Sequence, residues 1–230
     1  MSLATLLVLA DGRLPAGGHA HSGGLEAAVA AGRVRDLDSL AGFLRGRLAT
    51  GGLVAASFAA AACARYQVVV PPAPAVTAVT HGGIVDLDAG MDARTPSPAL
   101  RRASRAQGRA LLRAARAMWP VPADAGREPH HPVALGVVAA AAGLDPVAVA
   151  TAAAHQAVTG PAGAAVRLLG LDPYAAHGLV AALAPECDRI AADAARRAGD
   201  PVDALPAAGA PLIDIGAEHH ASWEVRLFAS

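Results

Sequence analysis

Residues 11–26 read DGRLPAGGHAHSGGLE, and this stretch carries the strongest local signal in the chain. Five glycines surround Pro15, two histidines and a serine, and an apolar helical pattern follows directly. Glycine adopts backbone conformations that other residues avoid, and it lets a second backbone come close. The stretch is therefore predicted to turn tightly or to lie against another surface, between a first short helix and the rest of the fold.

The sequence on both sides of this stretch predicts helices, because no segment alternates with a period of two over any length. Residues 3–10 form the first expected helix, with a strand as the alternative on periodicity alone. Asp36 or Asp38 is expected to cap a later helix whose leucines share one face. Residues 51–52, both glycine, are predicted to end that helix before an alanine-rich one over residues 53–66.

The second half of the chain repeats one helix-start signal. Ser97, Asp145 and Asp172 each precede a proline, the arrangement of an N-cap followed by the first helical residue. The helices predicted after the first ones cover residues 84–93, 97–119, 132–142, 146–159, 162–169, 173–183 and 185–198. The proline-rich residues 68–83 and the residues after 206 are predicted to be irregular. We therefore expect an all-α, single-domain bundle of roughly ten helices over residues 1–230, with an irregular C-terminal tail.

Composition excludes several classes of protein. Hydrophobic residues make up 54% of the chain and charged residues 17%, which excludes global disorder. A formal net charge of zero gives no reason to expect nucleic-acid binding. Cys63 and Cys187 belong to no CxxC pattern, so we expect a reduced, cytoplasmic chain. The apolar N-terminal run is short, and the uncharged residues 48–64 fall short of the roughly 20 strongly apolar residues of a membrane span. We therefore expect no membrane segment.

The sequence motifs of common enzymes are missing from the chain. It contains no phosphate-binding P-loop, no dinucleotide-binding fingerprint after a strand and no GxSxG nucleophile elbow. Ser22 could act as a nucleophile with His21 as its base, but the sequence identifies no carboxylate that would orient the histidine. A hydrolase is therefore the weakest hypothesis, and we predict no catalytic residue and no cofactor.

Histidine pairs give the main alternative hypothesis. The nine histidines include three close pairs, namely His19 with His21, His130 with His131, and His219 with His220. Such a pair can donate two imidazoles to nickel or zinc. No HExxH helix accompanies them and no cysteine lies near them, so no residue is assigned as a metal ligand. A metal-handling protein that holds nickel through one of these pairs stays open as the alternative.

Two features suggest a binding partner. The arginines at positions 102, 105, 109, 113 and 116 recur at helical spacing, which is typical of a solvated face and alternatively of a docking surface for an acidic partner. The end of the chain carries Trp223, Arg226 and Phe228, side-chain types that are favoured as binding anchors. This tail either docks on its own domain or is held for a partner.

Three motifs in order resemble the family of the urease accessory protein UreF. Residues 9–26, LADGRLPAGGHAHSGGLE, are similar to the family's N-terminal pattern LADSxxPxGGFxHSxGLE. Residues 103–112, ASRAQGRALL, are similar to its helix AS-x-x-x-GR-x-LL, and residues 211–230, PLIDIGAEHHASWEVRLFAS, to its ending P-x-x-DI…H…RLF-x-S. HPVALG from His131 and AAVRLLGL from Ala164 also fit, so the resemblance spans nearly the whole chain. The chain departs from the pattern at His19, where the family has an aromatic residue, at Ala16 and at Ala221.

The resemblance implies an all-α, dimeric, non-catalytic assembly factor. Such proteins bridge the accessory protein UreD, also called UreH, and the nickel-carrying GTPase UreG, and they help to deliver nickel to the urease apoprotein. In the family the C-terminal tail, here about residues 207–230, becomes ordered against UreD/UreH, and the arginine that matches Arg226 helps to recruit the GTPase. The resemblance and the unusual segments together give these expected partner-binding residues: Pro15, Gly17, Gly18, His19, His21, Ser22, Gly24, Glu26, Arg109, Trp223, Arg226, Leu227, Phe228 and Ser230.

Overall fold

The computed structural model describes residues 2–67, 81–122 and 125–230, and every regular element within these ranges is a helix. The all-α prediction is therefore confirmed. In chain order the elements are α1 (Leu3–Ala10), η1 (Gly18–Ala20), α2 (Leu25–Ala30), α3 (Leu37–Arg47), η2 (Leu48–Gly52), α4 (Leu53–Gln67), α5 (His81–Ala93), α6 (Pro98–Ala115), α7 (His131–Ala141), α8 (Pro146–Leu169), α9 (Pro173–Arg196), η3 (Val202–Ala204) and α10 (Pro211–Ala221).

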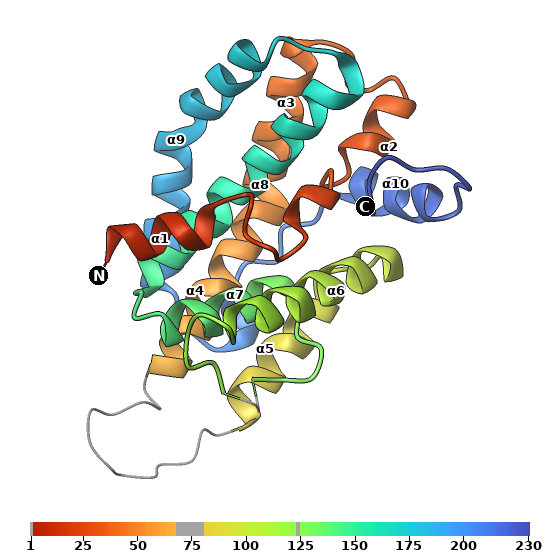
Figure 1. Ribbon diagram of the computed structural model, residues 1–230. Coiled ribbons are helices and arrows are strands. Elements are labelled where there is room, and N and C mark those ends of the chain that lie inside the picture. The colour runs from red at the N-terminus through yellow and green to blue at the C-terminus, as the bar shows by residue number, and fades with distance from the viewer. Residues whose placement is uncertain (1, 68–80, 123–124) are drawn as a thin grey trace, which may run out of the picture.

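The helices are arranged around α4 and α8. Helix α8 packs along α9 and also contacts α4, and α4 in turn contacts α7 and α9. Figure 1 shows α3, α8 and α9 running side by side through the upper part of the molecule, with α5, α6 and α7 at its lower end. Helix α10 lies beside α2 on one side of the bundle, and the N-terminus at the start of α1 lies on the opposite side.

Small side chains let the central helices approach closely. Four consecutive alanines of α4, residues 59–62, are fully buried, as are Phe58 and Cys63. Helix α7 crosses α4 at Gly136, where a Cβ would lie 2.3 Å from the Ala59 carbonyl oxygen. A larger residue at position 136 would force the two helices apart. The alanine-rich faces are therefore used for packing inside the chain.

One long helical stretch of the structure is apolar enough to resemble a membrane span. It covers Leu37–Tyr66, that is α3, η2 and most of α4 without a break. Of its most apolar window, 61% is buried inside the bundle. This stretch is the central helix of the core, and its apolar character is explained by that burial.

The helix starts predicted at Asp36, Ser97, Asp145 and Asp172 are confirmed by side-chain hydrogen bonds. Asp36 accepts from the Ser39 backbone N–H at 2.9 Å, and Ser97 accepts from the Leu100 N–H at 3.1 Å. Asp145 and Asp172 cap α8 and α9 in the same way. Each cap satisfies backbone donors that have no partner within the helix, which explains why the starts could be predicted from sequence alone.

The predicted breaks at residues 51–52, 160–161 and 185 are wrong. The two glycines lie in η2, a single π-helical turn that joins α3 to α4. Pro161 lies inside α8 and Pro185 inside α9. Because proline has no N–H, Pro161 leaves the Ala157 carbonyl oxygen without its helical donor. Arg47 Nε donates to that oxygen at 3.1 Å instead, so the surrounding fold tolerates the proline.

The C-terminal region is more regular than predicted. Pro211–Ala221 form α10, with Pro211 in the first turn, and the N-cap residue Ala210 has no side chain that could cap it. The usual start signal is therefore missing, and only residues 222–230 follow without helix. Of the predicted irregular residues 68–83, the last three begin α5, and residues 68–80 lie outside the described part of the chain.

Candidate functional site

The glycine-rich segment, residues 11–26, crosses the bundle between α1 and α2 (Figure 1). Gly17, Gly23 and Gly24 have φ values of 77°, 64° and 88°, in the left-handed region that favours glycine. Gly24 also lies directly against α10, because a Cβ there would stand 2.9 Å from Ile213 Cγ2. The segment therefore both turns tightly and accepts a close neighbour, as its composition predicts.

The C-terminal tail, residues 222–230, is docked on this segment by backbone hydrogen bonds. The Ala229 N–H donates to the Ala20 carbonyl oxygen at 2.7 Å. Ser22 donates twice to the backbone oxygen of Ser230, from its N–H at 2.7 Å and from its hydroxyl at 2.8 Å. His21 Nδ1 also lies 2.7 Å from Ser230 Oγ. The sequence leaves open whether the tail docks on its own domain or is held for a partner. In the structure the tail docks on its own domain.

Glu26 fixes the tail at its centre. This residue is only 8% exposed, and its carboxylate accepts the backbone N–H groups of Leu227 at 2.8 Å and Phe228 at 3.0 Å. His220 Nε2 donates to the same carboxylate at 2.8 Å. Burial alone would raise the pKa of Glu26, but the hydrogen bonds from Leu227, His220 and Phe228 outweigh it and lower the pKa. Glu26 is therefore an ionised carboxylate that accepts hydrogen bonds from donors of the tail and of α10.

Arg167 of α8 joins the two segments from the other side. Its guanidinium carbon lies 4.2 Å from the centre of the Phe228 ring, and its Nη2 donates to the His19 carbonyl oxygen at 3.0 Å. Phe228 is 3% exposed, whereas Arg167 is exposed, so only the ring side of this cation–π contact is shielded from water. One arginine thus contacts both the glycine-rich segment and the tail.

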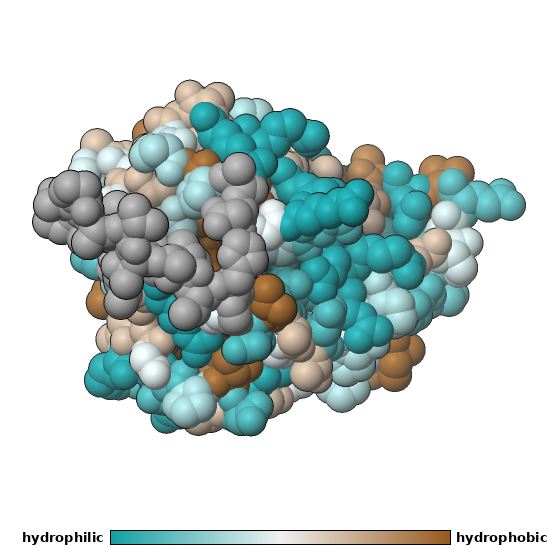
Figure 2. Space-filling model, turned by 90° about the horizontal axis from the view of Figure 1, so that it is seen from below, coloured by the Kyte–Doolittle hydropathy of each residue, from teal (hydrophilic) through white to brown (hydrophobic). Residues whose placement is uncertain are grey.

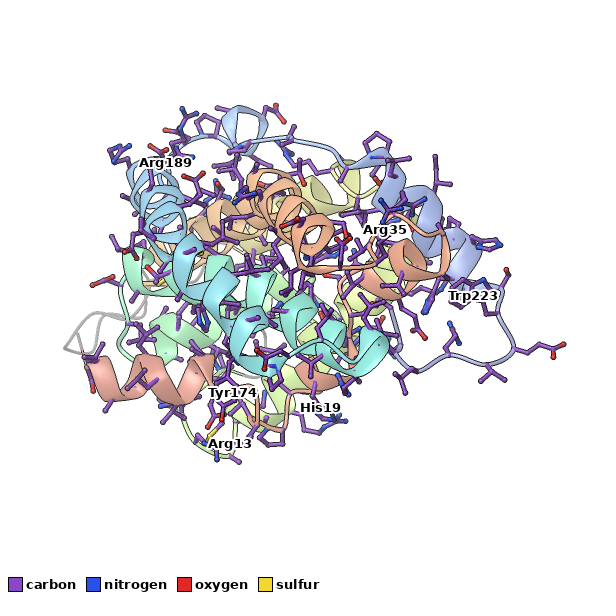
Figure 3. The ribbon with its side chains drawn as sticks, turned by 90° about the horizontal axis from the view of Figure 1, so that it is seen from above. Arg13, His19, Arg35, Tyr174, Arg189 and Trp223 are labelled. Carbon is purple, nitrogen blue, oxygen red and sulfur yellow. The ribbon has the colours of Figure 1, made fainter. Side chains whose placement is uncertain are left out.

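The middle of the tail points into solvent. Val225 and Leu227 are 87% and 59% exposed, and Arg226 between them is exposed and forms no ion pair within the described residues. Figure 3 shows Trp223 at the base of the loop that carries these residues outward. The Trp223 ring packs against His220, with ring centres 4.8 Å apart. The tail is therefore anchored at both ends and exposed between them.

Apart from Arg109, the predicted partner-binding residues fall into two groups in the structure. Ser22, Gly24, Glu26 and Phe228 are buried, and they hold the tail on the segment instead of facing a partner. The residues that keep a fully or partly exposed surface are Pro15, Gly17, Gly18, His19, His21, Trp223, Arg226, Leu227 and Ser230. We call this second group, together with Val225, the composite surface.

Arg109 lies apart from the composite surface. It is on α6, where its Nη1 atom lies 3.2 Å from a Glu128 carboxylate oxygen. The arginine stripe of α6 is not uniformly solvated either, because Arg105 pairs with Asp88 and Asp92 at 2.7 Å each. The face seen in Figure 2, at the end of the molecule where α5 and α6 lie, is largely hydrophilic.

Two of the three histidine pairs are separated by the fold, whereas His19 and His21 both line one cavity. His130 is fully buried between Asp92 and Ser104, whereas its neighbour His131 lines a cavity. His220 binds Glu26, and His219 is exposed against Trp223. Within residues 2–67, 81–122 and 125–230, no group of three or more His, Cys, Asp or Glu side chains is placed to hold a metal ion. The metal-handling alternative therefore gains no support from the geometry.

Ser22 is also poorly placed for catalysis. Its hydroxyl is buried, donates to Ser230 and accepts the Glu26 N–H at 3.2 Å. The neighbouring His21 bonds to Ser230 and not to Ser22. A nucleophile needs an accessible oxygen within reach of its base, so this arrangement stabilises the tail and does not suggest a hydrolase.

Sequence reasoning missed two residues of the site. Arg167 is one arginine in a helix whose sequence shows no sign that it contacts His19 and Phe228. His220 stood out only as one of two neighbouring histidines, and its partner Glu26 is 194 positions away. Only the three-dimensional arrangement identifies these contacts.

Comparisons with known proteins identify a family, and relatives that match the full length of the chain. The family model named UreF matches residues 34–184. The urease accessory protein UreF of Mycobacterium sp. strain JLS is 47% identical over 234 residues, covering 100% of this chain and 99% of that protein. The proteins of the same name from Mycolicibacterium vanbaalenii and Mycobacterium tuberculosis strain H37Rv are 47% and 42% identical over 231 and 234 residues, with the same coverage. The similarity therefore includes the glycine-rich segment and the tail.

Proposed function

The chain belongs to the UreF family of urease accessory proteins, and from this premise we propose that it is a non-catalytic scaffold for nickel insertion. In this proposal it bridges UreD (also called UreH) and the nickel GTPase UreG, so that nickel reaches the active site of the urease apoprotein. The protein works in the cytoplasm and uses no cofactor of its own. It acts by holding partners in place, and no step of the chemistry is assigned to its side chains.

One observation carries this proposal. The tail buries Phe228 and is held by Glu26, yet Val225 and Leu227 stay exposed on either side of Arg226. Apolar side chains gathered in one exposed patch are typical of an interaction site, and arginine is a frequent anchor in protein interfaces. The tail is thus pre-ordered, which lowers the entropy cost of binding a partner.

The exposed part of the glycine-rich segment extends the same surface. His19 is exposed, and its carbonyl oxygen is bonded to Arg167, which also contacts the Phe228 ring. Two stretches about two hundred positions apart in sequence therefore form one continuous region. We propose that UreD/UreH binds across this composite surface and that Arg226 contributes to the recruitment of UreG.

The proposal includes a homodimer. The alanine-rich faces of α4, α7 and α8 are buried within the chain and are not free to pair. Leu212 and Ile215 of α10, however, are 62% and 66% exposed. They lie beside an apolar groove of about 370 Å³ that Phe43, Val34 and Ile213 help to line. A projecting patch next to a groove on the same face suits a two-fold symmetric contact, so the dimer is proposed to form through α10.

A binding experiment with an arginine variant tests the bridging role. Purified UreD/UreH and UreG are titrated with the wild-type protein, with Arg226→Ala and with Arg197→Ala, whose arginine is exposed but lies far from the tail in sequence. Losing a buried, charge-assisted bond costs about 2 kcal/mol or more, which is a loss of roughly 30-fold in affinity. The expected result is this loss for Arg226→Ala alone. An unchanged affinity of Arg226→Ala for both partners would contradict the proposal.

A further inference from the structure

A cavity of about 470 Å³ lies beneath the glycine-rich segment, away from the exposed residues of the tail. Besides the segment, residues of α1, α3, η2, α4, α6, α7 and α8 line the cavity. Polar side chains from five of these parts line it, among them His21 of the segment, Arg47 of α3, Gln107 of α6, His131 of α7 and Gln156 of α8. Of the composite surface, Gly18, His19 and His21 also line this cavity, whereas the residues of the tail do not.

Arg47 brings a positive charge to this cavity. Its Nη1 donates to the Gly23 carbonyl oxygen at 2.8 Å and its Nε donates to Ala157 at 3.1 Å. These bonds use two of the five N–H groups that a guanidinium offers. Burial lowers the pKa of Arg47 to about 10, because both of its partners are neutral carbonyl groups. In the part of the chain that the structure describes, no carboxylate lies within ion-pair distance of Arg47.

The other charged and titratable groups of the cavity do not neutralise Arg47. Asp11 is the carboxylate that lines it, and both of its oxygens are bonded to Arg13 at 3.0 and 3.1 Å. Burial and the nearby His21 lower the pKa of His131 to about 4, so His131 is a neutral imidazole that can donate one N–H. Arg167 adds a second guanidinium to the lining. The cavity is therefore positive and rich in hydrogen-bond donors.

A positive charge together with several hydrogen-bond donors favours an anionic ligand over a cationic one. A divalent cation would be repelled by Arg47, and the described residues offer no cluster of three metal-ligating side chains. A guanidinium with free N–H groups matches the geometry of a planar or tetrahedral oxyanion. We propose that the cavity binds a small oxyanion of the phosphate or bicarbonate class, with Arg47 as its charge partner and with His131 and Gln107 as hydrogen-bond donors.

Isothermal titration calorimetry with inorganic phosphate tests this assignment, with sodium chloride at the same ionic strength as the reference. The expected result is saturable, one-to-one binding of phosphate to the wild-type protein. Arg45→Met removes an exposed arginine two positions from Arg47 on the same helix, and it should bind phosphate as the wild type does. Arg47→Met should abolish the binding. Bicarbonate, titrated in parallel at fixed pH, shows which member of the class binds more tightly.

Arg47→Met also removes the donor to Ala157, so this variant can fail to fold. Gln107→Leu and His131→Phe leave that bond in place and should each weaken phosphate binding at least fivefold, with thermal unfolding used to check that they are folded. The absence of saturable binding to the wild type would overturn the proposal. Binding of equal strength in Gln107→Leu, His131→Phe and any folded Arg47→Met would overturn it as well, because the ion would then bind elsewhere as an adventitious ion only.

Discussion

The carboxylate of Glu26 accepts the backbone N–H of Phe228 at 3.0 Å, across 202 positions of the chain. The same carboxylate also binds Leu227 and His220, so three donors from the last part of the sequence meet on one residue near its beginning. Glu26 therefore couples the order of the C-terminal tail to the shape of the glycine-rich segment. Substitutions of Glu26 should weaken the docking of the tail.

Glu26→Gln should release the tail without unfolding the bundle. Glutamine has a similar shape, but it carries no charge and has one acceptor oxygen in place of two. Replacing charge-assisted hydrogen bonds with neutral or missing ones costs about 2 kcal/mol. Amide hydrogen exchange should become faster at Leu227 and Phe228 while the core helices stay protected. Glu224→Gln, an exposed carboxylate of the same tail, is the control and should leave the exchange unchanged.

The docked tail should also respond to acid. The pKa of Glu26 is lower in the folded protein than its ordinary value of 4.5, so its ionised form stabilises docking. This contribution is complete above the ordinary value and is lost as pH falls through the lower folded value. Hydrogen exchange of residues 222–230 should therefore be insensitive to pH between 7 and 5, after correction for the intrinsic rate, and the protection should fall below about pH 4. Loss of protection already at pH 6 would assign the effect to another group.

The contact between Arg167 and Phe228 should give a measurable coupling energy. Arg167→Gln, Phe228→Leu and the double variant form a thermodynamic cycle for tail docking. Because Arg167 is exposed, the cation–π contact should contribute about 0.5–1 kcal/mol. The two single effects should therefore sum to more than the effect of the double variant by that amount. Docking is read from the exchange of the Ala229 amide, which is bonded to Ala20. Strict additivity would show that the arginine acts on His19 alone.

The helix starts and the all-α class could be predicted from the sequence, because both depend on local chemistry. Asp36, Ser97 and Asp145 lie within three residues of the N–H groups that they cap. The continuity of α8 through Pro161 could not be predicted, because the replacement donor is Arg47, which is 110 positions from Ala157. Resemblance to a family identified the glycine-rich segment and the tail as important. That they bind each other follows only from the contacts of Glu26, Ser22 and Ser230.

A buried network that joins α5, α6 and α7 should govern the stability of the lower end of the bundle. His130 is fully buried and bridges Ser104 and Asp92, and its backbone N–H donates to Asp88 at 2.7 Å. His130→Leu would leave Ser104 and Asp92 without this partner, at a cost of about 2–3 kcal/mol in the free energy of unfolding. Urea denaturation measures this loss. His177→Leu, at an exposed position of α9, should change it by less than about 0.5 kcal/mol.

The central claim is that partners bind the tail while it is docked on the glycine-rich segment. A disulfide between Ala20→Cys and Ala229→Cys would lock these two hydrogen-bonded positions together, and the native Cys63 and Cys187 are both buried. The measurement is the affinity of this variant for UreD/UreH and UreG, in its oxidised and reduced forms. The account predicts that the oxidised, locked protein binds both partners at least as tightly as the reduced one. Loss of binding on oxidation, restored by reduction, would contradict it by showing that the tail must leave the segment to bind.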